Sequence, residues 1–150
     1  MNVKPNTQGA TPVDIASHHL KPGAMPWDKM RFTGCECKTL LFEPTSGLAT
    51  VLIKMQPGAT LPDHEHVLIE QTYVLEGSLV DKEGPDAGLA VKAGEFVWRP
   101  AGSRHVAWCP DGGTMIAIFQ VPNKFFEADG RVIDAAGEDW DAAWGHTGKG

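Results

Sequence analysis

The sequence predicts an all-β fold, arranged either as an antiparallel barrel or as a sandwich. Its 17 glycines and 11 prolines, spread over 150 residues, divide the chain into short intervals. About eight apolar runs of strand length recur at spacings of about 8 to 12 residues, each bounded by Gly, Pro, Asp or Ser. No amphipathic helix of ordinary length competes with this pattern, so a single β domain is the expected organisation.

The predicted strands follow an N-terminal arm and loop over residues 1–30, in which residues 1–12 carry almost no apolar periodicity. Turn-forming stretches such as PTSG and PGAT separate the runs. In chain order the runs are CECKTLLFE (35–43), LATVLIKMQ (48–56), GATLPDHEHVLIEQTYVLEG (58–77) with the hairpin-like TYVLEGSLVD (72–81), LAVK (89–92), EFVW (95–98), HVAWC (105–109) and TMIAIFQV (114–121). Together they place the β domain at residues 31–121.

Residues 122–150 form a C-terminal extension that is expected to pack on the β domain. Only EDWDAAW, residues 138–144, has a helical pattern, and Asp139 suits its N-cap position. Trp140 and Trp144 lie four positions apart and therefore on one face of such a helix. Large apolar side chains placed in this way predict a lid on the barrel wall and no ligand role.

The composition excludes several classes of partner. A formal charge of −6 and a pI near 5.4 leave no basic surface to neutralise phosphates, so no nucleic acid is expected. No apolar run approaches the length that spans a bilayer, so no membrane is expected either. The three cysteines form no CxxC pair and are predicted to be buried free thiols. Without a disulfide framework, and with no apolar leader after Met1, the expected location is the cytoplasm.

The run that begins at Gly58 carries three polar residues, His64, His66 and Glu70, in front of the apolar TYVL. Residues two apart on a strand face the same side, so the two histidines are expected to point into one space. Glu70 lies four positions beyond His66, an even offset, and falls on that face again. Buried polar groups need partners, and these three can share one as ligands of a metal ion.

A fourth candidate ligand lies in GEFVWRPAGSRH, residues 94–105. Pro100 cannot donate to a strand ladder, and Gly102 admits backbone angles that other residues avoid. The PAG turn therefore fixes where the following strand starts, and His105 has a defined position at that start. A metal ligand needs such rigidity, because coordination geometry tolerates only small errors.

These two segments resemble the paired motifs of the cupin superfamily. The matching residues are Gly58, His64, His66, Glu70 and Gly77 in the first motif, and Gly94, Pro100, Gly102 and His105 in the second. The resemblance implies an antiparallel cupin barrel, or jelly roll, over residues 31–121, followed by a short helical segment. It also implies one divalent transition metal, with His64, His66, Glu70 and His105 as ligands. Fe2+ is favoured, and Mn2+, Ni2+, Zn2+ or Cu2+ also suit this donor set.

A narrower similarity lies in the C-terminal extension. Residues 122–144 look like the tail of the cupins that include acetylacetone-cleaving dioxygenase, which hold Fe(II) with three histidines and no carboxylate. Glu70 departs from that pattern by keeping the four-ligand spacing, and Cys109 stands where the second cupin motif has Asn. The barrel also resembles the cupin-like domain of zinc-binding anti-sigma factors.

Further side chains are candidates for binding a substrate. Arg99 and Arg104 flank the PAG turn, where they can hold an anionic substrate or pair with nearby Asp and Glu residues at the rim. An apolar wall beside a metal keeps water from the reaction, and strand alternation lets only some of its candidates face inward. The candidates are Arg99, Arg104, Trp98, Phe96, Phe119 and Gln120, with Trp108 as a further wall residue. Gln71 and Tyr73 lie at odd offsets from Glu70 and should face outward.

The leading hypothesis is a non-haem, metal-dependent dioxygenase that acts on a small diketone, hydroxyketone or related oxygenated compound. One alternative is a metal-dependent isomerase, decarboxylase or lyase that uses the same site. The other is a non-enzymatic module that senses a metal or small molecule, as the likeness to the anti-sigma cupins implies. Cupins serve many chemistries, so the motifs do not choose between these functions.

The strand CECKTLLFE is also a candidate for association. Open strand edges invite pairing, and small barrels of the cupin superfamily commonly dimerise at such an edge, so a homodimer through residues 35–43 is expected. The remaining histidines, His18, His19 and His146, have no companion ligands at suitable spacing and are assigned to the surface.

Overall fold

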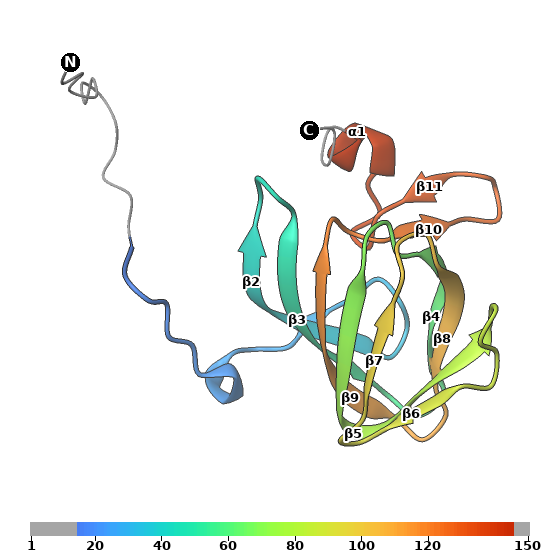
Figure 1. The fold of residues 1–150 in the computed structure, drawn as a ribbon, viewed down its shortest axis with the longest axis horizontal. Coiled ribbons are helices and arrows are strands. Elements are labelled where there is room, and N and C mark those ends of the chain that lie inside the picture. Colours follow the sequence, from blue (N-terminus) through green and yellow to red (C-terminus); the bar gives the residue numbers. More distant parts are fainter. Residues whose placement is uncertain (1–14, 146–150) are drawn as a thin grey trace, which may run out of the picture.

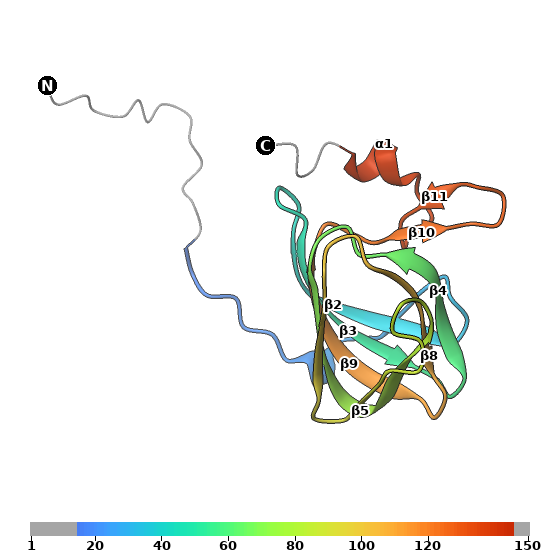
Figure 2. The ribbon, with the colours of Figure 1, turned by 45° about the vertical axis from the view of Figure 1, so that its right-hand side comes forward.

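In residues 15–145, the part of the chain that the computed structural model describes, eleven strands form one curled antiparallel sheet (Figure 1). The sheet folds back on itself as a half-barrel, and a short helix follows near the C-terminus (Figure 2). These features confirm the predicted all-β class with a short C-terminal helical segment.

The strands β2 to β9 build the half-barrel, and two more strands and a helix follow. The strand bounds are β1 Asp28–Lys29, β2 Cys35–Glu43, β3 Leu48–Met55, β4 Ala59–Glu65, β5 Glu70–Glu83, β6 Ala90–Lys92, β7 Phe96–Arg99, β8 Arg104–Cys109, β9 Gly113–Gln120, β10 Lys124–Phe126 and β11 Val132–Ile133. The helices are the 3-10 helix η1 (Pro22–Ala24) and α1 (Trp140–Trp144). The run predicted at 35–43 coincides with β2.

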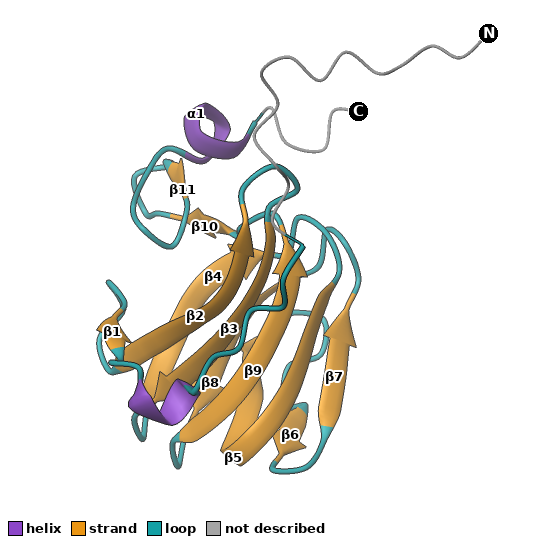
Figure 3. Cartoon of the chain, turned by 90° about the vertical axis from the view of Figure 1, so that its left-hand side faces the viewer, coloured by secondary structure: helices purple, strands orange, loops and turns teal. Residues whose placement is uncertain are grey.

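Strand β5 belongs to both walls of the half-barrel. Along one wall the neighbours run β1-β2-β3-β9-β5, and β7 pairs with the first part of β5 (Figure 3). Along the other wall β5 continues to β8, β4, β10 and β11, and β6 pairs with its second part. Because side chains alternate along each strand, both walls send every second side chain into the enclosed interior.

The hairpin predicted at Glu76–Gly77 is wrong, because the chain bends there without turning back. The pairing of β5 with β9 shifts register between Val74 and Glu76, and the strand runs on to Glu83. Gly77 has a φ of 68°, and a Cβ at this position would collide with the carbonyl oxygen of Gly112. This glycine therefore bends one long strand around the barrel, a role that glycines also play at bulges.

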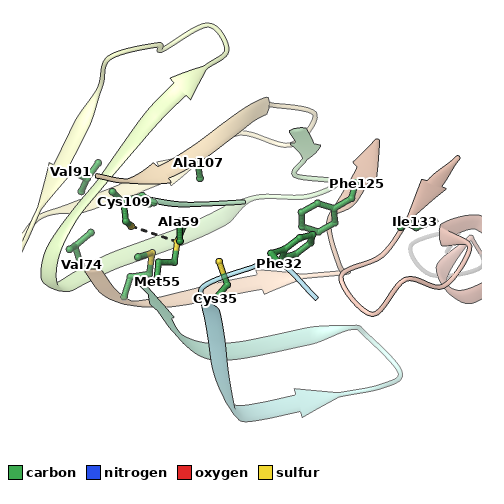
Figure 4. Packing of buried hydrophobic residues seen from close by; sticks show 12 residues of the cluster. Phe32, Cys35, Met55, Ala59, Val74, Val91, Ala107, Cys109, Phe125 and Ile133 are labelled. Carbon is green, nitrogen blue, oxygen red and sulfur yellow. Dashed lines mark hydrogen bonds between the residues drawn. The ribbon is translucent and has the colours of Figure 1, made fainter. Parts of the chain in front are cut away.

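The interior contains a cluster of sulfur and aliphatic side chains (Figure 4). Met55, Met115 and Cys109 are each at most 2% exposed, and the Cys109 thiol lies 3.6 Å from the Met55 sulfur. Burial raises the pKa of Cys109 to about 12 and that of Cys35 to about 11, so both thiols stay protonated at neutral pH. All three cysteines are free, as predicted, although Cys37 is only half-buried.

The described N-terminal segment lies outside the barrel. Residues 15–20 are all exposed, and this segment runs away from the strands (Figure 1). The Trp27 ring centre lies 4.4 Å from Nζ of Lys38 and 4.3 Å from Nζ of Lys54. These cation–π contacts attach the segment to the outer face of β2 and β3.

The C-terminal extension lies over one end of the half-barrel (Figure 2). Strand β10 pairs with β4, and β11 pairs with β10; the sequence predicted neither short strand. The Asp139 side chain accepts a 2.9 Å hydrogen bond from the N–H of Ala142, which confirms the predicted N-cap. The buried Trp140 donates from Nε1 to the carbonyl oxygen of Pro122 at 2.8 Å and ties α1 to the extension.

The outer surface bears on three further expectations. His18 and His19 are exposed, as predicted, whereas His146 and residues 1–12 lie outside the described residues. Within residues 15–145, no helix is both long enough and apolar enough to cross a bilayer. The edge predicted for a homodimer, residues 35–43, pairs with β3 on one side and on the other only with the two residues of β1.

Replacing Gly77 with alanine is expected to destabilise the fold strongly. The added methyl group meets backbone atoms of a neighbouring loop, and it forces a left-handed backbone angle on a non-glycine residue. The combined cost is about 2 to 4 kcal/mol of unfolding free energy, measurable by urea denaturation.

Gly88→Ala is the matched control for this change. Gly88 also has a positive φ, of 94°, but nothing lies within 4 Å of the added carbon. A loss of about 1 kcal/mol is expected there. Equal losses in the two variants would contradict the close approach as the cause.

Candidate metal centre

Three histidine rings meet inside the half-barrel. His64 lies on β4 and His105 on β8, and the antiparallel register places these two residues opposite each other. Nε2 of His105 lies 3.0 Å from Nε2 of His64 and 3.1 Å from Nε2 of His66. All three residues are buried, and their candidate ligand atoms lie within 4.8 Å of one another. The structure therefore brings together three of the four predicted ligands.

His66 reaches this cluster from a loop. Strand β4 ends one residue before His66 and β5 begins at Glu70, so the single strand assumed for the parity argument is wrong. The N–H of His66 donates to the carbonyl oxygen of Ser103 at 2.8 Å. The N–H of Gly102 donates to the carbonyl oxygen of His66 at 2.7 Å. The PAG turn, which was expected to position His105, therefore positions His66 as well.

The ring of His64 is fixed in one tautomer. Its Nδ1 atom lies 2.7 Å from the carbonyl oxygen of Pro62, which can only accept, so Nδ1 carries the hydrogen and Nε2 keeps its lone pair. Burial, followed by the nearby rings of His105 and His66, lowers the pKa of His64 to about 3. The ring is therefore neutral at physiological pH, the form in which imidazole binds metal ions.

Carboxylates lie behind the other two rings. Nδ1 of His66 lies 3.2 Å from Oε2 of Glu70. Nδ1 of His105 lies 3.1 Å from Oδ1 of Asp81. Both are ion-pair distances, although neither ring is aligned for a well-directed hydrogen bond. Ionised carboxylates only accept, so they favour the tautomer with the hydrogen on Nδ1, which would turn the Nε2 lone pairs inward.

The donor set fits a metal ion. Three imidazole nitrogens that converge in a buried space need a shared partner, and a cation between them would accept all three lone pairs. His64, His66 and His105 would hold a divalent transition metal through three nitrogen ligands, and such a metal would keep positions for other ligands, as a catalytic metal requires.

Glu70, the fourth predicted ligand, is not part of the nitrogen cluster. Its carboxylate contacts His66 and accepts further hydrogen bonds of 3.4 Å from Thr72 Oγ1 and Asn123 Nδ2. Burial pushes the pKa of Glu70 upward, but the neighbouring His66 and the hydrogen bonds outweigh it and lower the pKa to about 2. In this structure the ionised Glu70 orients a ligand ring from behind.

A cavity of about 360 Å³ lies under the C-terminal extension, and none of the three histidines lines it. Phe125 connects the two, because its ring lines the cavity and lies 5.1 Å from the ring of His64. Asn123, which contacts Glu70, lines the cavity as well. The inner faces of β2 and β3 supply much of the wall, and it is mostly apolar. Among the described residues, no lysine, arginine or histidine lines this cavity.

The carboxylate on the cavity wall, that of Asp134, is already bonded. Its Oδ1 accepts from the N–H groups of Ala136 at 2.9 Å and Glu138 at 3.0 Å. Its Oδ2 accepts from Nε1 of Trp144 at 2.9 Å. Asp134 therefore holds Trp144 and the end of the extension over the cavity. The negative charge of its carboxylate is already stabilised by these three hydrogen bonds.

The two arginines predicted to hold an anionic substrate are engaged elsewhere. Arg99 is buried and donates twice to Asp81, from Nη1 to Oδ2 at 2.8 Å and from Nη2 to Oδ1 at 2.6 Å. Arg104 donates to Asp63 at 2.8 and 2.5 Å, and its guanidinium stacks 3.7 Å from the ring centre of Phe126. Pairing with acidic residues, the alternative that the sequence left open, is the arrangement found.

Of the predicted substrate-binding aromatic residues, only Phe119 lines the cavity. Trp98 and Phe96 are 57% and 53% exposed. Arg99 points inward at the end of β7, so alternation along the strand turns Trp98 and Phe96 outward. Gln120 is exposed at the end of β9, and Trp108 lies between two buried residues of β8. Trp98, Phe96 and Gln120 therefore lie outside this cavity, and their substrate-binding roles stay a prediction.

Sequence reasoning missed Asp81 and Asn123 as neighbours of the histidines. Asp81 carried a signal, since it is a charged residue two positions after the apolar Leu79, on the same face of a strand. The assumption of a hairpin at Gly77 hid that signal. Asn123 follows the last strand of the barrel, and nothing in its neighbourhood distinguishes it from a loop residue.

A known protein family matches most of this chain. The profile of the ChrR cupin-like domain matches residues 16–124, well over half of the chain. The chain belongs to this family. The cupin resemblance inferred from the two motifs is thereby confirmed. None of the curated protein sequences compared with this cupin matches it.

Solved structures support the fold of this cupin. An acetylacetone dioxygenase from Acinetobacter johnsonii has a TM-score of 0.73 at 19% identity, covering 91% of this chain and 94% of that chain. A protein from Methylibium petroleiphilum PM1, proposed to be an acetylacetone dioxygenase, has a TM-score of 0.72 at 22% identity, covering 90% and 99%. A cupin-like protein of unknown function from Ralstonia eutropha JMP134 has a TM-score of 0.59 at 28% identity, covering 67% and 64%.

Replacing either His66 or His105 with alanine is expected to abolish stoichiometric metal binding, because two imidazoles remain where three converged. Calorimetric titration of the metal-free protein with Zn2+ measures this. His18→Ala is the control, since this exposed histidine lies outside the cluster and its loss should leave one ion per chain.

The variant Glu70→Gln separates two roles for this carboxylate. A residue that orients His66 from behind should cost about 10- to 100-fold in metal affinity when replaced. Loss of stoichiometric binding, equal to that in the histidine variants, would identify Glu70 as a ligand. Full stoichiometry in His66→Ala would contradict the metal centre itself.

Proposed function

We propose that this cupin is a metal-dependent dioxygenase that acts on a small, neutral diketone, hydroxyketone or related oxygenated compound. The observation that carries this proposal is the cluster of three histidines, which the Phe125 ring separates from an apolar cavity that, in the described residues, has no basic lining. A redox-active divalent metal, Fe2+ by preference, supplies Lewis acidity toward a substrate oxygen and electrons for dioxygen. His64, His66 and His105 would hold it.

The cavity favours a neutral substrate of modest size. Its volume of about 360 Å³ lies near the lower end for small-molecule sites. Val51, Ile53 and Phe119 offer apolar contacts, and the Asp134 carboxylate is occupied by its own donors. An anion would find no counter-ion on this wall, and desolvating an unpaired charge is costly. A neutral molecule can direct its oxygen atoms toward the histidines and its apolar end toward β2 and β3.

The residues around the cavity have separable tasks in this proposal. Phe125 and Phe119 exclude water from the end nearest the histidines, which favours chemistry that water would interrupt. Asn123 holds Glu70, which in turn faces His66. At the other end, Trp144 meets Phe42 edge-on, with ring centres 5.9 Å apart, where the extension approaches the β2–β3 hairpin.

The similarity to acetylacetone dioxygenases supports the reaction class. Two such neighbours share the fold over nine-tenths or more of this chain. This resemblance implies a ligand set of three histidines without a coordinating carboxylate. The cluster here also consists of three histidines and no carboxylate. An isomerase, decarboxylase or lyase would use the same site without consuming dioxygen.

The family match favours a second candidate function, a module that senses a metal or a small molecule. The same cavity and histidines would then hold a ligand without converting it. Catalytic turnover distinguishes the two functions, because a sensor binds its ligand and releases it unchanged.

The Fe2+-loaded protein is expected to consume dioxygen with acetylacetone and not with acetoacetate, an anion of similar size that the cavity cannot neutralise. An oxygen electrode measures the rate. Val51→Trp, which fills the cavity, should lower kcat/KM by about tenfold or more through misplacement of the substrate, with metal stoichiometry unchanged. The control Leu89→Trp lies on the surface and should not change the rate.

Other outcomes of this assay would favour an alternative function or contradict the proposed substrate class. Conversion of acetylacetone without oxygen uptake would favour an isomerase, decarboxylase or lyase. Binding of a diketone without any conversion would favour the sensing module. Equal rates with acetylacetone and acetoacetate would contradict the selection of neutral substrates by the cavity.

A further inference from the structure

A buried ion pair lies behind one of the three histidines. The side chains of Arg99 and Asp81 are only 6% and 1% exposed and are joined by two hydrogen bonds of 2.8 and 2.6 Å. The Oδ1 atom of Asp81 that accepts from Arg99 also lies 3.1 Å from Nδ1 of His105. Residues of β7, β5 and β8 thus form one line of contacts that ends at the Nε2 atom of His105 in the cluster.

We propose that Asp81 is a positioning residue for His105 and that Arg99 holds Asp81 in place. The proposal rests on the metal site described under the proposed function. Asp81 fixes the rotation of the His105 ring so that Nε2 faces the other two histidines. Arg99 supplies the charge that lets an ionised carboxylate occupy this buried position.

Stability alone does not account for a pair of this kind. Removing each ion from water costs several kcal/mol, and apolar residues of similar volume often serve a fold equally well or better. A buried ion pair of this kind is better explained by a functional role of its carboxylate. A carboxylate behind a metal-binding imidazole fixes the tautomer and the ring orientation and makes the ring a better ligand.

The three rings differ in what orients them. His64 faces a backbone carbonyl, which the fold of β4 supplies, and His66 faces Glu70. Only His105 depends on a carboxylate that is fully buried and bound by a guanidinium. Glu70 and Asp81 both belong to β5, one on each side of the bend at Gly77, so a single strand orients two of the three rings.

Asp81→Asn is expected to weaken metal binding by about 10- to 100-fold, the usual effect of removing such an outer partner. Competition titration against a chromogenic chelator measures the affinity. The visible absorption of the Co2+-substituted protein should shift as well, because the His105 ring changes orientation. Arg99→Gln should produce a loss in the same direction. The matched control is Asp63→Asn, which breaks the surface pair with Arg104 and should leave both readouts unchanged.

The double variant Asp81→Leu with Arg99→Met separates positioning from folding. Apolar replacement of both ions should keep the thermal midpoint near that of the parent chain, while metal affinity stays as low as in Asp81→Asn. Metal affinity within twofold of the parent in Asp81→Asn, with an unchanged Co2+ spectrum, would overturn this inference and leave the metal site standing. A parent chain that binds no metal would overturn the proposed function instead.

An independent observation concerns the outer face of the wall formed by β3, β9, β5 and β7. Two rows of outward side chains cross these strands in register: Phe96, Tyr73, Ile116 and Leu52, and then Trp98, Gln71, Ile118 and Thr50. No charged residue belongs to either row. Trp98, Phe96 and Tyr73 are 57%, 53% and 42% exposed, so a flat apolar face meets solvent. The outward orientation predicted for Gln71 and Tyr73 is confirmed.

The geometry points to a second copy of this chain as the occupant of that face. Three strands contribute eight residues each and β7 contributes four, which at about 4.8 Å between strands and about 3.3 Å per residue gives roughly 440 Å² in plan. This is about half of the ~800 Å² that each partner buries in a stable complex, and side-chain relief adds to it. In a dimer with twofold symmetry, this face packs against the same face of the partner. Each chain has a net charge of −6, but the patch itself is uncharged and so does not repel its copy.

Sedimentation equilibrium at tens of micromolar should give twice the chain mass of 16.2 kDa. Tyr73→Lys combined with Trp98→Glu places charges at the centre of the contact and should reduce the mass to that of one chain. Leu89→Glu, an exposed apolar residue outside the two rows, is the control and should remain a dimer. A parent chain of 16.2 kDa would overturn this inference. Persistence of the dimer in the double variant would also overturn it and favour the edge at residues 35–43.

Discussion

The structure depends on keeping three buried imidazole rings together, with Nε2 of His105 3.0 and 3.1 Å from Nε2 of the other two. Buried polar groups need partners, and each ring faces an oxygen acceptor on its Nδ1 side. Pro62, Glu70 and Asp81 supply those three oxygen atoms. Each of them needs its own support, which comes from a backbone strand, from Thr72 and Asn123, and from Arg99. The cluster therefore fixes side chains well beyond its own three residues.

The bend in β5 follows from this constraint. A straight strand of fourteen residues would leave the half-barrel, and it could not contact His66 near its start and His105 near its end. Gly77 lets the strand cross from one wall to the other while its backbone passes close to Gly112. The need for glycine at the bend therefore affects the histidine cluster although the bend lies away from it. This explains why Gly77 belongs to the first cupin motif without contacting a histidine of the cluster.

The sequence predicted those parts of the site that depend on short-range rules. The PAG turn, the start of β8 and the positions of β2 and β3 follow from turn chemistry and apolar runs, and the structure agrees with them. The place of Glu70 did not follow, because a parity count fails as soon as a loop interrupts the strand after His64. The pairing of Arg99 with Asp81 depends on which strands become neighbours, and strand order in a barrel is set by long-range packing that spacing does not record.

The charges buried around the cluster restrict the chemistry one step further. Arg99 and Asp81 offset each other, and the neutral His64 contributes nothing, so Glu70 leaves one negative charge beside the histidines. A divalent cation held there would leave one positive charge, which a monoanion balances best. A substrate that is already anionic would have to cross a cavity whose described lining offers it no basic residue. On the proposed function, a diketone would enter neutral, pass its acidic C–H proton to water and bind as a monoanion, which would meet both conditions. On this proposal, the pairing of Arg99 with Asp81 and of Arg104 with Asp63 would favour such a substrate, because neither arginine lines the cavity.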